Sequence, residues 1–208
     1  MESLLRNTFN NMIQEYEVIF ESYYPSHHST GFMEANQVHL FAKSLCNLQS
    51  DAFSWFEAPL KKVGRSYPRI DAVIFIPGLE AVVFIEAKRI NNPNAKVNEI
   101  YKDIDRLLID NNRNHIMAKV KFDIKHQYIV YLADVWLETK NKKSIPYWWC
   151  SKEKPDGILD RVSSRYKDTQ TFVERMQSVG VNWNIKNQHI HEFRMVENYC
   201  LMFGIHKI

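Results

Sequence analysis

The sequence has few of the residues that build disordered or fibrous proteins. Its 208 residues include only 6 glycines and 7 prolines, whereas 45% are hydrophobic and 25% are charged. This composition is typical of an ordered globular protein and excludes collagen-like or low-complexity chains. The length predicts a single domain, 1–208, whose hydrophobic core is large enough to be stable without disulfides or a structural metal.

Cysteine is scarce as well. Cys46, Cys150 and Cys200 are an odd number, lie far apart and form no Cys-x-x-Cys pair. They predict reduced, mostly buried thiols of a cytoplasmic protein and not a disulfide framework. His189 and His191 alternate as ligands on a strand would, but no second pair of His or Cys at zinc spacing accompanies them, so no structural zinc is expected.

Long hydrophobic runs and a dominant charge sign are also missing. The longest apolar stretches, 72–79 and 81–85, are too short to span a bilayer, and charged residues interrupt 1–20, so neither a membrane segment nor a signal peptide is predicted. We expect a soluble, cytoplasmic protein. The net charge of +3 and the pI near 8.6 are compatible with a polyanionic partner without requiring one.

The apolar patterns that are present predict an α/β fold. Hydrophobic periodicity predicts, in chain order, helices at 2–22 and 32–48, strands at 52–63, 69–76 and 81–88, a helix at 95–111, a strand at 127–136, a helix at 168–179 and a strand at 199–208. Antiparallel strands flanked by helices favour a mixed sheet with helices packed on it. Residues 77–80 supply a turn between the second and third strands.

Charged residues stand at the ends of the two strands that this turn joins. Glu86 and Lys88 share one face of the strand at 81–88, because side chains alternate with period two. Asp71 begins the apolar run of the preceding strand. An antiparallel hairpin brings the start of one strand beside the end of the other, so we expect Asp71 to lie near Glu86 and Lys88.

These residue types suit the hydrolysis of a phosphodiester. Carboxylates at a sheet edge form a hard-oxygen site for Mg²⁺ or Mn²⁺. Such a cation neutralises phosphate oxygens and lowers the pKa of a water molecule. A lysine that points the same way can orient this water or stabilise the charge that develops on the phosphoryl oxygens.

The ordered set of Asp71, a hairpin and Glu86-Ala87-Lys88 resembles the D…(D/E)xK signature of the PD-(D/E)XK nuclease superfamily. The resemblance covers about residues 32–136, where helix, three strands, helix and strand follow in the order of the restriction-endonuclease-like core. It implies a metal-dependent nuclease that hydrolyses DNA, with Asp71, Glu86 and Lys88 as catalytic residues. It also implies that Asp71, Glu86 and the Ala87 carbonyl bind Mg²⁺ or Mn²⁺.

The resemblance extends to the first core helix but not to every part of the signature. The family often places an additional acidic residue on that helix, and Glu34 matches this catalytic role. Ile70 stands where the family has a proline, which is a weakly held part of the signature. The N-terminal helix at 2–22 and the C-terminal extension at 137–208 lie outside the resemblance.

Simpler interpretations stay open for these residues. Glu86 and Lys88 can form a surface ion pair of little energetic consequence, and Glu34 can be a first-turn carboxylate favoured by the helix dipole. A catalytically inactive nuclease fold that binds nucleic acid or serves in assembly is the main alternative function. In an unrelated α/β protein, the carboxylates of Asp71 and Glu86 would lie more than about 8 Å apart, too far to share a metal ion.

Other polar residues carry weaker predictions. Lys102 and Arg106, on the helix after the motif, are candidate DNA-phosphate contacts, and Asp103 is expected to form an ordinary surface pair with Arg106. Glu57 is expected at a solvated edge more than at the metal.

The remaining sequence adds two expectations. The rings of residues 147–149 are expected to fill a core more than to stack on bases, and 140–143 is expected to be a solvated loop. Double-strand cleavage needs two active sites, which favours a homodimer, although no predicted helix marks an interface.

Overall fold

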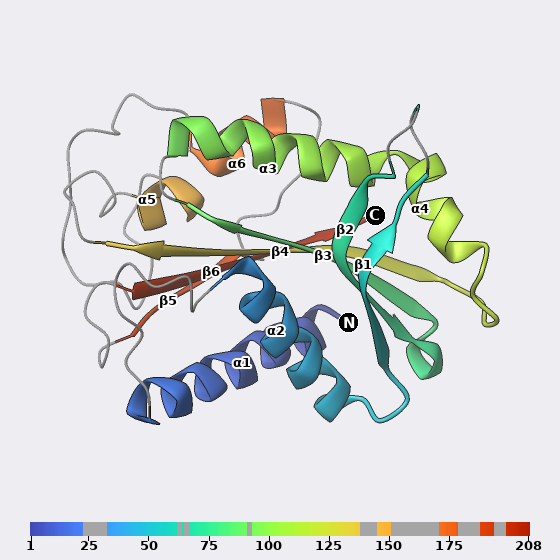
Figure 1. Ribbon diagram of the computed structural model, residues 1–208, viewed down its shortest axis with the longest axis horizontal. Coiled ribbons are helices and arrows are strands. Elements are labelled where there is room, and N and C mark those ends of the chain that lie inside the picture. The colour runs from blue at the N-terminus through green and yellow to red at the C-terminus, as the bar shows by residue number, and fades with distance from the viewer. Residues whose placement is uncertain are drawn as a thin grey trace.

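The computed structural model shows one central β-sheet with helices on both faces (Figure 1). It describes residues 1–22, 33–61, 64, 67–90, 93–137, 145–150, 171–178, 188–193 and 199–208. The predicted α/β class with a mixed sheet is confirmed. In the described part of the chain, no helix is both long enough and apolar enough to cross a membrane.

Six strands of the described chain form the sheet in the order β1-β2-β3-β4-β6-β5. They are β1 (Phe53–Pro59), β2 (Arg69–Ile76), β3 (Ala81–Arg89), β4 (His126–Trp136), β5 (Gln188–Glu192) and β6 (Tyr199–Lys207). β3 and β4 run parallel, and every other neighbouring pair is antiparallel. Both faces of β3 and β4 are covered, which explains why their sequences are almost continuously apolar.

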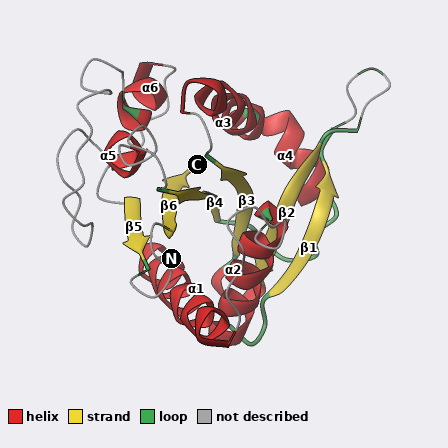
Figure 2. Ribbon diagram, turned by 60° about the vertical axis from the view of Figure 1, so that its left-hand side comes forward, coloured by secondary structure: helices red, strands yellow, loops and turns green. Residues whose placement is uncertain are grey.

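The helices form two layers (Figure 2). One layer contains α1 (Glu2–Ser22) and α2 (Glu34–Leu48), and the other contains α3 (Pro93–Leu108), α4 (Asp110–Met117), α5 (Ile145–Cys150) and α6 (Phe172–Ser178). The first layer packs on β6, where the ring of Phe203 stacks on Phe9 of α1 at 4.8 Å and lies 5.8 Å from the ring of Phe41 of α2. The sheet thus separates one apolar cluster beneath α1 and α2 from two clusters beneath the other helices.

The helix expected at 95–111 is wrong in its extent. It begins at Pro93, ends at Leu108, and is followed by α4, which was not predicted. Side chains satisfy the last carbonyls of α3, since Asn112 Nδ2 donates to the Arg106 carbonyl at 2.8 Å and Arg113 donates to the Leu107 carbonyl. The strand expected at 52–63 ends at Pro59, although the Leu60 amide still donates to the Pro68 carbonyl at 2.9 Å.

The C-terminal region supplies a strand next to the centre of the sheet. The expected closing strand is β6, which pairs with β4 from Tyr199 to Lys207, and the unpredicted β5 pairs with its other edge. Trp148 and Trp149 are buried, as expected of core rings, and Trp149 stacks on Phe172 at 4.4 Å.

Some predicted features lie partly outside the described residues. Residues 140–143 and the beginning of the helix expected at 168–179 are among them, as are the side chains of Tyr147, Cys150 and His189. The structure contains Cys200 as a buried free thiol and Cys46 as a half-buried one.

Candidate active site

β2 and β3 separate at one end of their shared ladder. Their last paired residues are Ala72 and Ile85, whereas β3 remains paired with β4 as far as Arg89. Asp71 and Glu86 are the next cross-strand neighbours after that pair, so both side chains project from the same face where the strands part. The hairpin therefore brings together the two carboxylates that the sequence placed at its ends.

The separation leaves backbone groups of β3 without a strand partner on this side. The amide of Ala87 donates to Asp71 Oδ2 at 2.8 Å, and the amide of Arg89 donates to Glu34 Oε1 at 2.8 Å. In a strand, the N–H and C=O of one residue point to the same side. The carbonyl of Ala87 therefore points into the same opening as Asp71.

Asp71 and Glu86 interact directly. Burial raises the pKa of Asp71, and a side-chain hydrogen bond with Glu86 opposes this effect. The side chain of Glu86 is only 2% exposed. Burial, and then the negative charges of Asp71 and Asp103, raise the pKa of Glu86 well above its usual range. A hydrogen bond between the two carboxyl groups is incompatible with the separation of more than about 8 Å expected of an unrelated fold.

Two cations hold this acidic cluster together. Lys88 Nζ lies 3.3 Å from Asp103 Oδ2 and 3.9 Å from Glu34 Oε2. Arg106 Nη2 donates to Glu86 Oε1 at 2.6 Å and lies 3.3 Å from Asp103 Oδ1. The cluster consequently joins α2, β3 and α3 across the opening beside β2.

Asp103 belongs to this cluster, although the sequence favoured an ordinary surface pair with Arg106. Its predicted ion pair with Arg106 exists, but the two side chains are only 15% and 27% exposed, and the hydroxyl of Tyr131 donates to Asp103 at 3.5 Å. The sequence contained a signal for the burial of Asp103, because this residue lies one turn from Ile100, which belongs to the buried stripe of α3. Lys102 is exposed, and its predicted phosphate contact stays a prediction.

A buried ion pair adjoins the cluster and was not predicted. Arg89 Nη2 donates to Asp134 Oδ2 at 3.0 Å, and the hydroxyl of Tyr199 donates to the same oxygen at 3.0 Å. Asp134 is 0% exposed, and its burial outweighs these partners and raises its pKa to about 6. The sequence signal is an acidic residue inside the apolar run 127–136.

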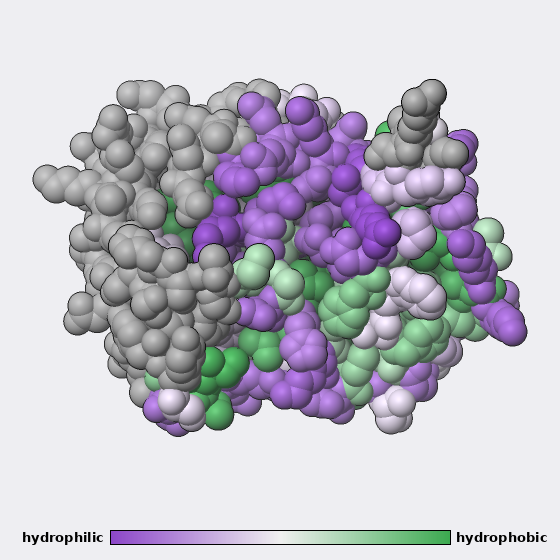
Figure 3. Space-filling view, viewed as in Figure 1, coloured by the Kyte–Doolittle hydropathy of each residue, from purple (hydrophilic) through white to green (hydrophobic). Residues whose placement is uncertain are grey.

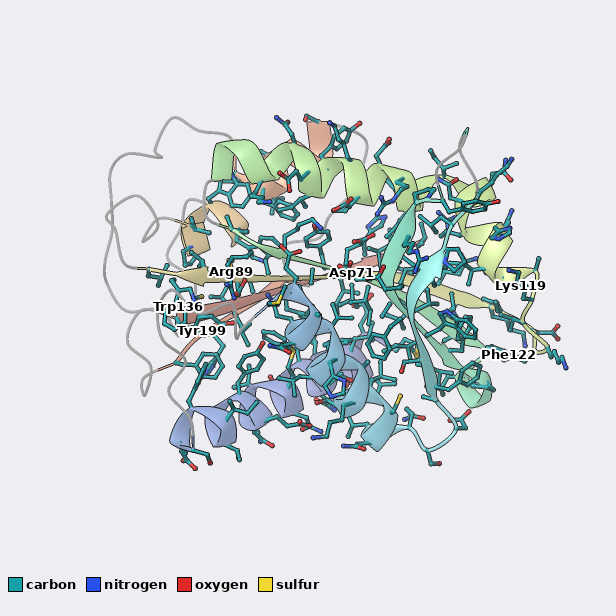
Figure 4. The ribbon with its side chains drawn as sticks, viewed as in Figure 1. Asp71, Arg89, Lys119, Phe122, Trp136 and Tyr199 are labelled. Atoms are coloured by element: carbon teal, nitrogen blue, oxygen red, sulfur yellow. The ribbon has the colours of Figure 1, made fainter. Side chains whose placement is uncertain are left out.

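A cavity of about 530 Å³ opens beside Asp71, and Glu34, Glu57 and Arg89 also line it. Figure 4 shows Asp71 near the middle of the view and Arg89 to its left, both below α3. Glu57 has a positive φ of 53° and lies between two pairs of the β1–β2 ladder, Phe56 with Ala72 and Ala58 with Ile70, at the position across from Asp71 that the ladder skips. Its side chain is exposed, as expected, but it borders the candidate site.

The donor set fits a hard divalent cation bound by few protein ligands. The described residues contain no ready-made group of three or more His, Cys, Asp and Glu side chains for a metal ion. Asp71, Glu86 and the Ala87 carbonyl offer an oxygen set of the kind that Mg²⁺ uses when it keeps several waters. Burial, and then the negative charge of Asp71, raise the pKa of Glu86, and a cation bound between the two carboxylates would offset that repulsion.

Comparison with protein-family models, with curated proteins and with solved structures finds no match for this chain.

Proposed function

We propose that this protein is a metal-dependent nuclease of the PD-(D/E)XK type that hydrolyses DNA phosphodiester bonds. The observation that carries the proposal is the convergence of Asp71, Glu86 and Lys88 where β2 and β3 part. Mg²⁺ or Mn²⁺ bound by Asp71, Glu86 and the Ala87 carbonyl would neutralise phosphate charge and lower the pKa of a water molecule. The restriction-endonuclease-like fold is part of this proposal.

Lys88 is suited to stabilise negative charge in the transition state. Burial disfavours its charged form, but the carboxylates of Asp103 and Glu34 outweigh this effect and raise the pKa of Lys88. A lysine that stays protonated at neutral pH is a hydrogen-bond donor and not a general base. Its ammonium group has three donors, so contacts with two carboxylates leave one for a phosphate oxygen or the attacking water.

Glu34 supports this arrangement from α2, on the other side of the sheet from α3. It accepts the Arg89 amide with one oxygen and lies near Lys88 with the other. These contacts fix where β3 ends and where the ammonium group of Lys88 is held. In the proposed reaction Glu34 is a positioning residue that reaches the substrate through Lys88.

One observation favours the alternative, a catalytically inactive nuclease fold that binds nucleic acid. Arg106 occupies Glu86 Oε1 at 2.6 Å, and an arginine bound to a carboxylate competes with a cation for it. The two functions separate in a binding assay. The inactive fold predicts salt-dependent DNA binding that survives loss of Asp71, Glu86 and Lys88.

The decisive experiment measures DNA cleavage with matched variants. Purified protein is incubated with duplex, single-stranded and branched DNA in Mg²⁺ or Mn²⁺, with EDTA as the metal-free reference. Asp71→Asn and Lys88→Met should each lower the rate by roughly 10²-fold or more, because each removes charge stabilisation at the reacting phosphate. Asp105→Asn and Lys207→Met, at exposed positions, should retain the parent rate.

Metal binding provides a second readout that does not depend on the substrate chosen. Electron paramagnetic resonance of Mn²⁺ should detect binding to the parent and to Lys88→Met, and weakened binding to Asp71→Asn. Intact DNA in every assay of the parent, together with Mn²⁺ binding unchanged in Asp71→Asn, would rule out the proposed enzyme.

A further inference from the structure

A second cavity, of about 550 Å³, lies between β1 and the segment that follows α4. Phe53 and Trp55 of β1 form one wall, and Phe122 lies in the segment opposite. Figure 4 labels Phe122 and Lys119 at the end of the molecule away from Arg89, with Asp71 between them. This cavity is therefore separate from the one beside Asp71, and β1 borders both.

The two aromatic rings of this wall are exposed, and packing holds the ring of Phe53 in place. Phe53 is 50% exposed and Trp55 is 61% exposed. The ring of Phe53 stacks on buried Phe75, with centroids 5.0 Å apart and an angle of 24°. The two exposed rings are two residues apart on one strand, hence on the same face and about 7 Å from each other. Exposed apolar groups gathered in this way mark a binding surface.

The rim of the cavity is positive. Lys119 and Lys121 are exposed, and the described residues that line the cavity include no carboxylate. Figure 3 shows hydrophobic and pale residues over the β1 side of the molecule, with hydrophilic ones beyond them. The cavity therefore presents a flat apolar surface with ammonium groups beside it.

This combination favours one occupant over the alternatives. A second copy of the chain related by a two-fold axis would bring the same lysines toward each other, which is unfavourable. Unpaired nucleotides present an apolar ring with a phosphate attached. Aromatic side chains that stack on bases, together with cations that follow the backbone, are the usual means of binding single strands.

We propose that this cavity binds unpaired nucleotides of single-stranded DNA, with bases on Phe53 and Trp55 and phosphates at Lys119 and Lys121. The inference rests on the proposed nuclease function for the identity of the polymer. β1 borders both cavities, since Trp55 is two residues from Glu57, which lines the cavity beside Asp71, although the two cavities open on opposite faces of this edge strand. A single strand bound here would reach the cavity beside Asp71 by passing around the edge of the sheet formed by β1, and the protein would prefer single-stranded or frayed DNA to a closed duplex.

Trp55 allows a direct test. Among the described tryptophans it is exposed, whereas Trp136, Trp148 and Trp149 are buried. Titration of the full chain with a short oligothymidylate in EDTA should quench tryptophan fluorescence, and added salt should weaken binding. Trp55→Leu should lose the quenching and bind roughly tenfold or more weakly in fluorescence anisotropy, since stacking on one base is lost.

Matched variants separate stacking from charge. The double variant Lys119→Gln and Lys121→Gln should bind more weakly and show a smaller salt dependence, while Lys207→Gln should bind like the parent. Val18→Ala, which removes an equally exposed apolar group on α1, should also bind like the parent.

Several results would overturn the inference. These are quenching that persists in Trp55→Leu, absence of quenching by single strands, and equal affinity for a blunt duplex. A parent dimer that becomes monomeric in Trp55→Leu by light scattering would assign the surface to contact between copies instead. Because the assay contains no metal, its failure leaves the cleavage test unaffected, and quenching without cleavage would contradict only the proposed enzyme.

Discussion

Buried charges distinguish the candidate site at the scale of single residues. Asp71 and Glu86 stay close to each other although burial raises the pKa of both. Asp134 is buried beside Arg89 in the same region. Groups with perturbed pKa values gather at functional sites more than elsewhere, and the cluster has the mixture of acids and cations that phosphoryl chemistry uses.

Asp134 predicts a measurable dependence of stability on pH. Burial raises its pKa from 3.8 to about 6, against the opposing effects of Arg89 and Tyr199, with Glu34 adding a smaller increase. Between these two pH values the folded protein holds a proton that the unfolded chain has released. The free energy of unfolding therefore falls as pH rises through this window, by up to about 3 kcal/mol from this residue.

The Asp134→Asn variant has no group that titrates at this position, so its comparison with the parent isolates the contribution of Asp134. Urea unfolding of the parent and the variant at pH 4, 5 and 7 should show that the stability advantage of the parent shrinks as pH rises. Other carboxyl groups titrate in both proteins and cancel in the difference. An advantage that stays constant or grows with pH would contradict the raised pKa.

At the scale of secondary structure, the opening beside Asp71 depends on two distorted strands. β3 leaves β2 after Ile85, and opposite Asp71 the edge strand β1 contains Glu57 with a φ of 53°. A residue with a side chain is unfavourable in this left-handed region, and such strain is common where function requires it. The regular alternation of strands could not predict either distortion, because each arises from contacts between elements.

Substitution of Glu57 tests whether the strain is real. Glu57→Gly should be as stable as the parent or more stable, because glycine adopts positive φ without steric conflict. Glu57→Val should be less stable than Glu57→Gly by about 1 kcal/mol or more, since a branched side chain is strongly disfavoured there. Denaturant unfolding of the two variants measures the difference. Equal stability of both would mean that the backbone at this position is extended in solution.

At the scale of the whole molecule, the C-terminal region completes the sheet. β6 lies between β4 and β5 and pairs with β4 along its length. Its residues Leu201, Phe203 and Ile205 belong to the core beneath α1 and α2. The predicted core at 32–136 therefore lacks a strand that buries one edge of β4.

Removal of this strand should abolish cooperative folding. A fragment containing residues 1–137 would expose the edge of β4 and the apolar face that β6 covers, and exposed edges of this kind aggregate. We expect circular dichroism to show no sharp thermal transition for the fragment and size-exclusion chromatography to show aggregates. The full chain is the control, and a monomeric fragment with a cooperative transition would contradict this dependence.

The local pattern of the chain determined most of the elements around the site. Period-two alternation and the turn at 77–80 were enough to predict β2, β3 and the meeting of Asp71 with Glu86, because a short hairpin allows few registers. Helical periodicity likewise predicted α2 and the position of Glu34 at its start.

Tertiary structure alone decided the contacts between distant segments. The pairing of Asp103 with Lys88 joins a helix to a strand, whereas the burial of Asp134 against Tyr199 and the place of β6 in the sheet join residues far apart in the sequence. Such contacts depend on how the helices pack on the sheet and on which charged groups are buried away from water. The surroundings of these side chains follow only from the complete fold. Burial and neighbouring charges determine how favourable a charged side chain is at its position, and the local sequence pattern has a smaller effect.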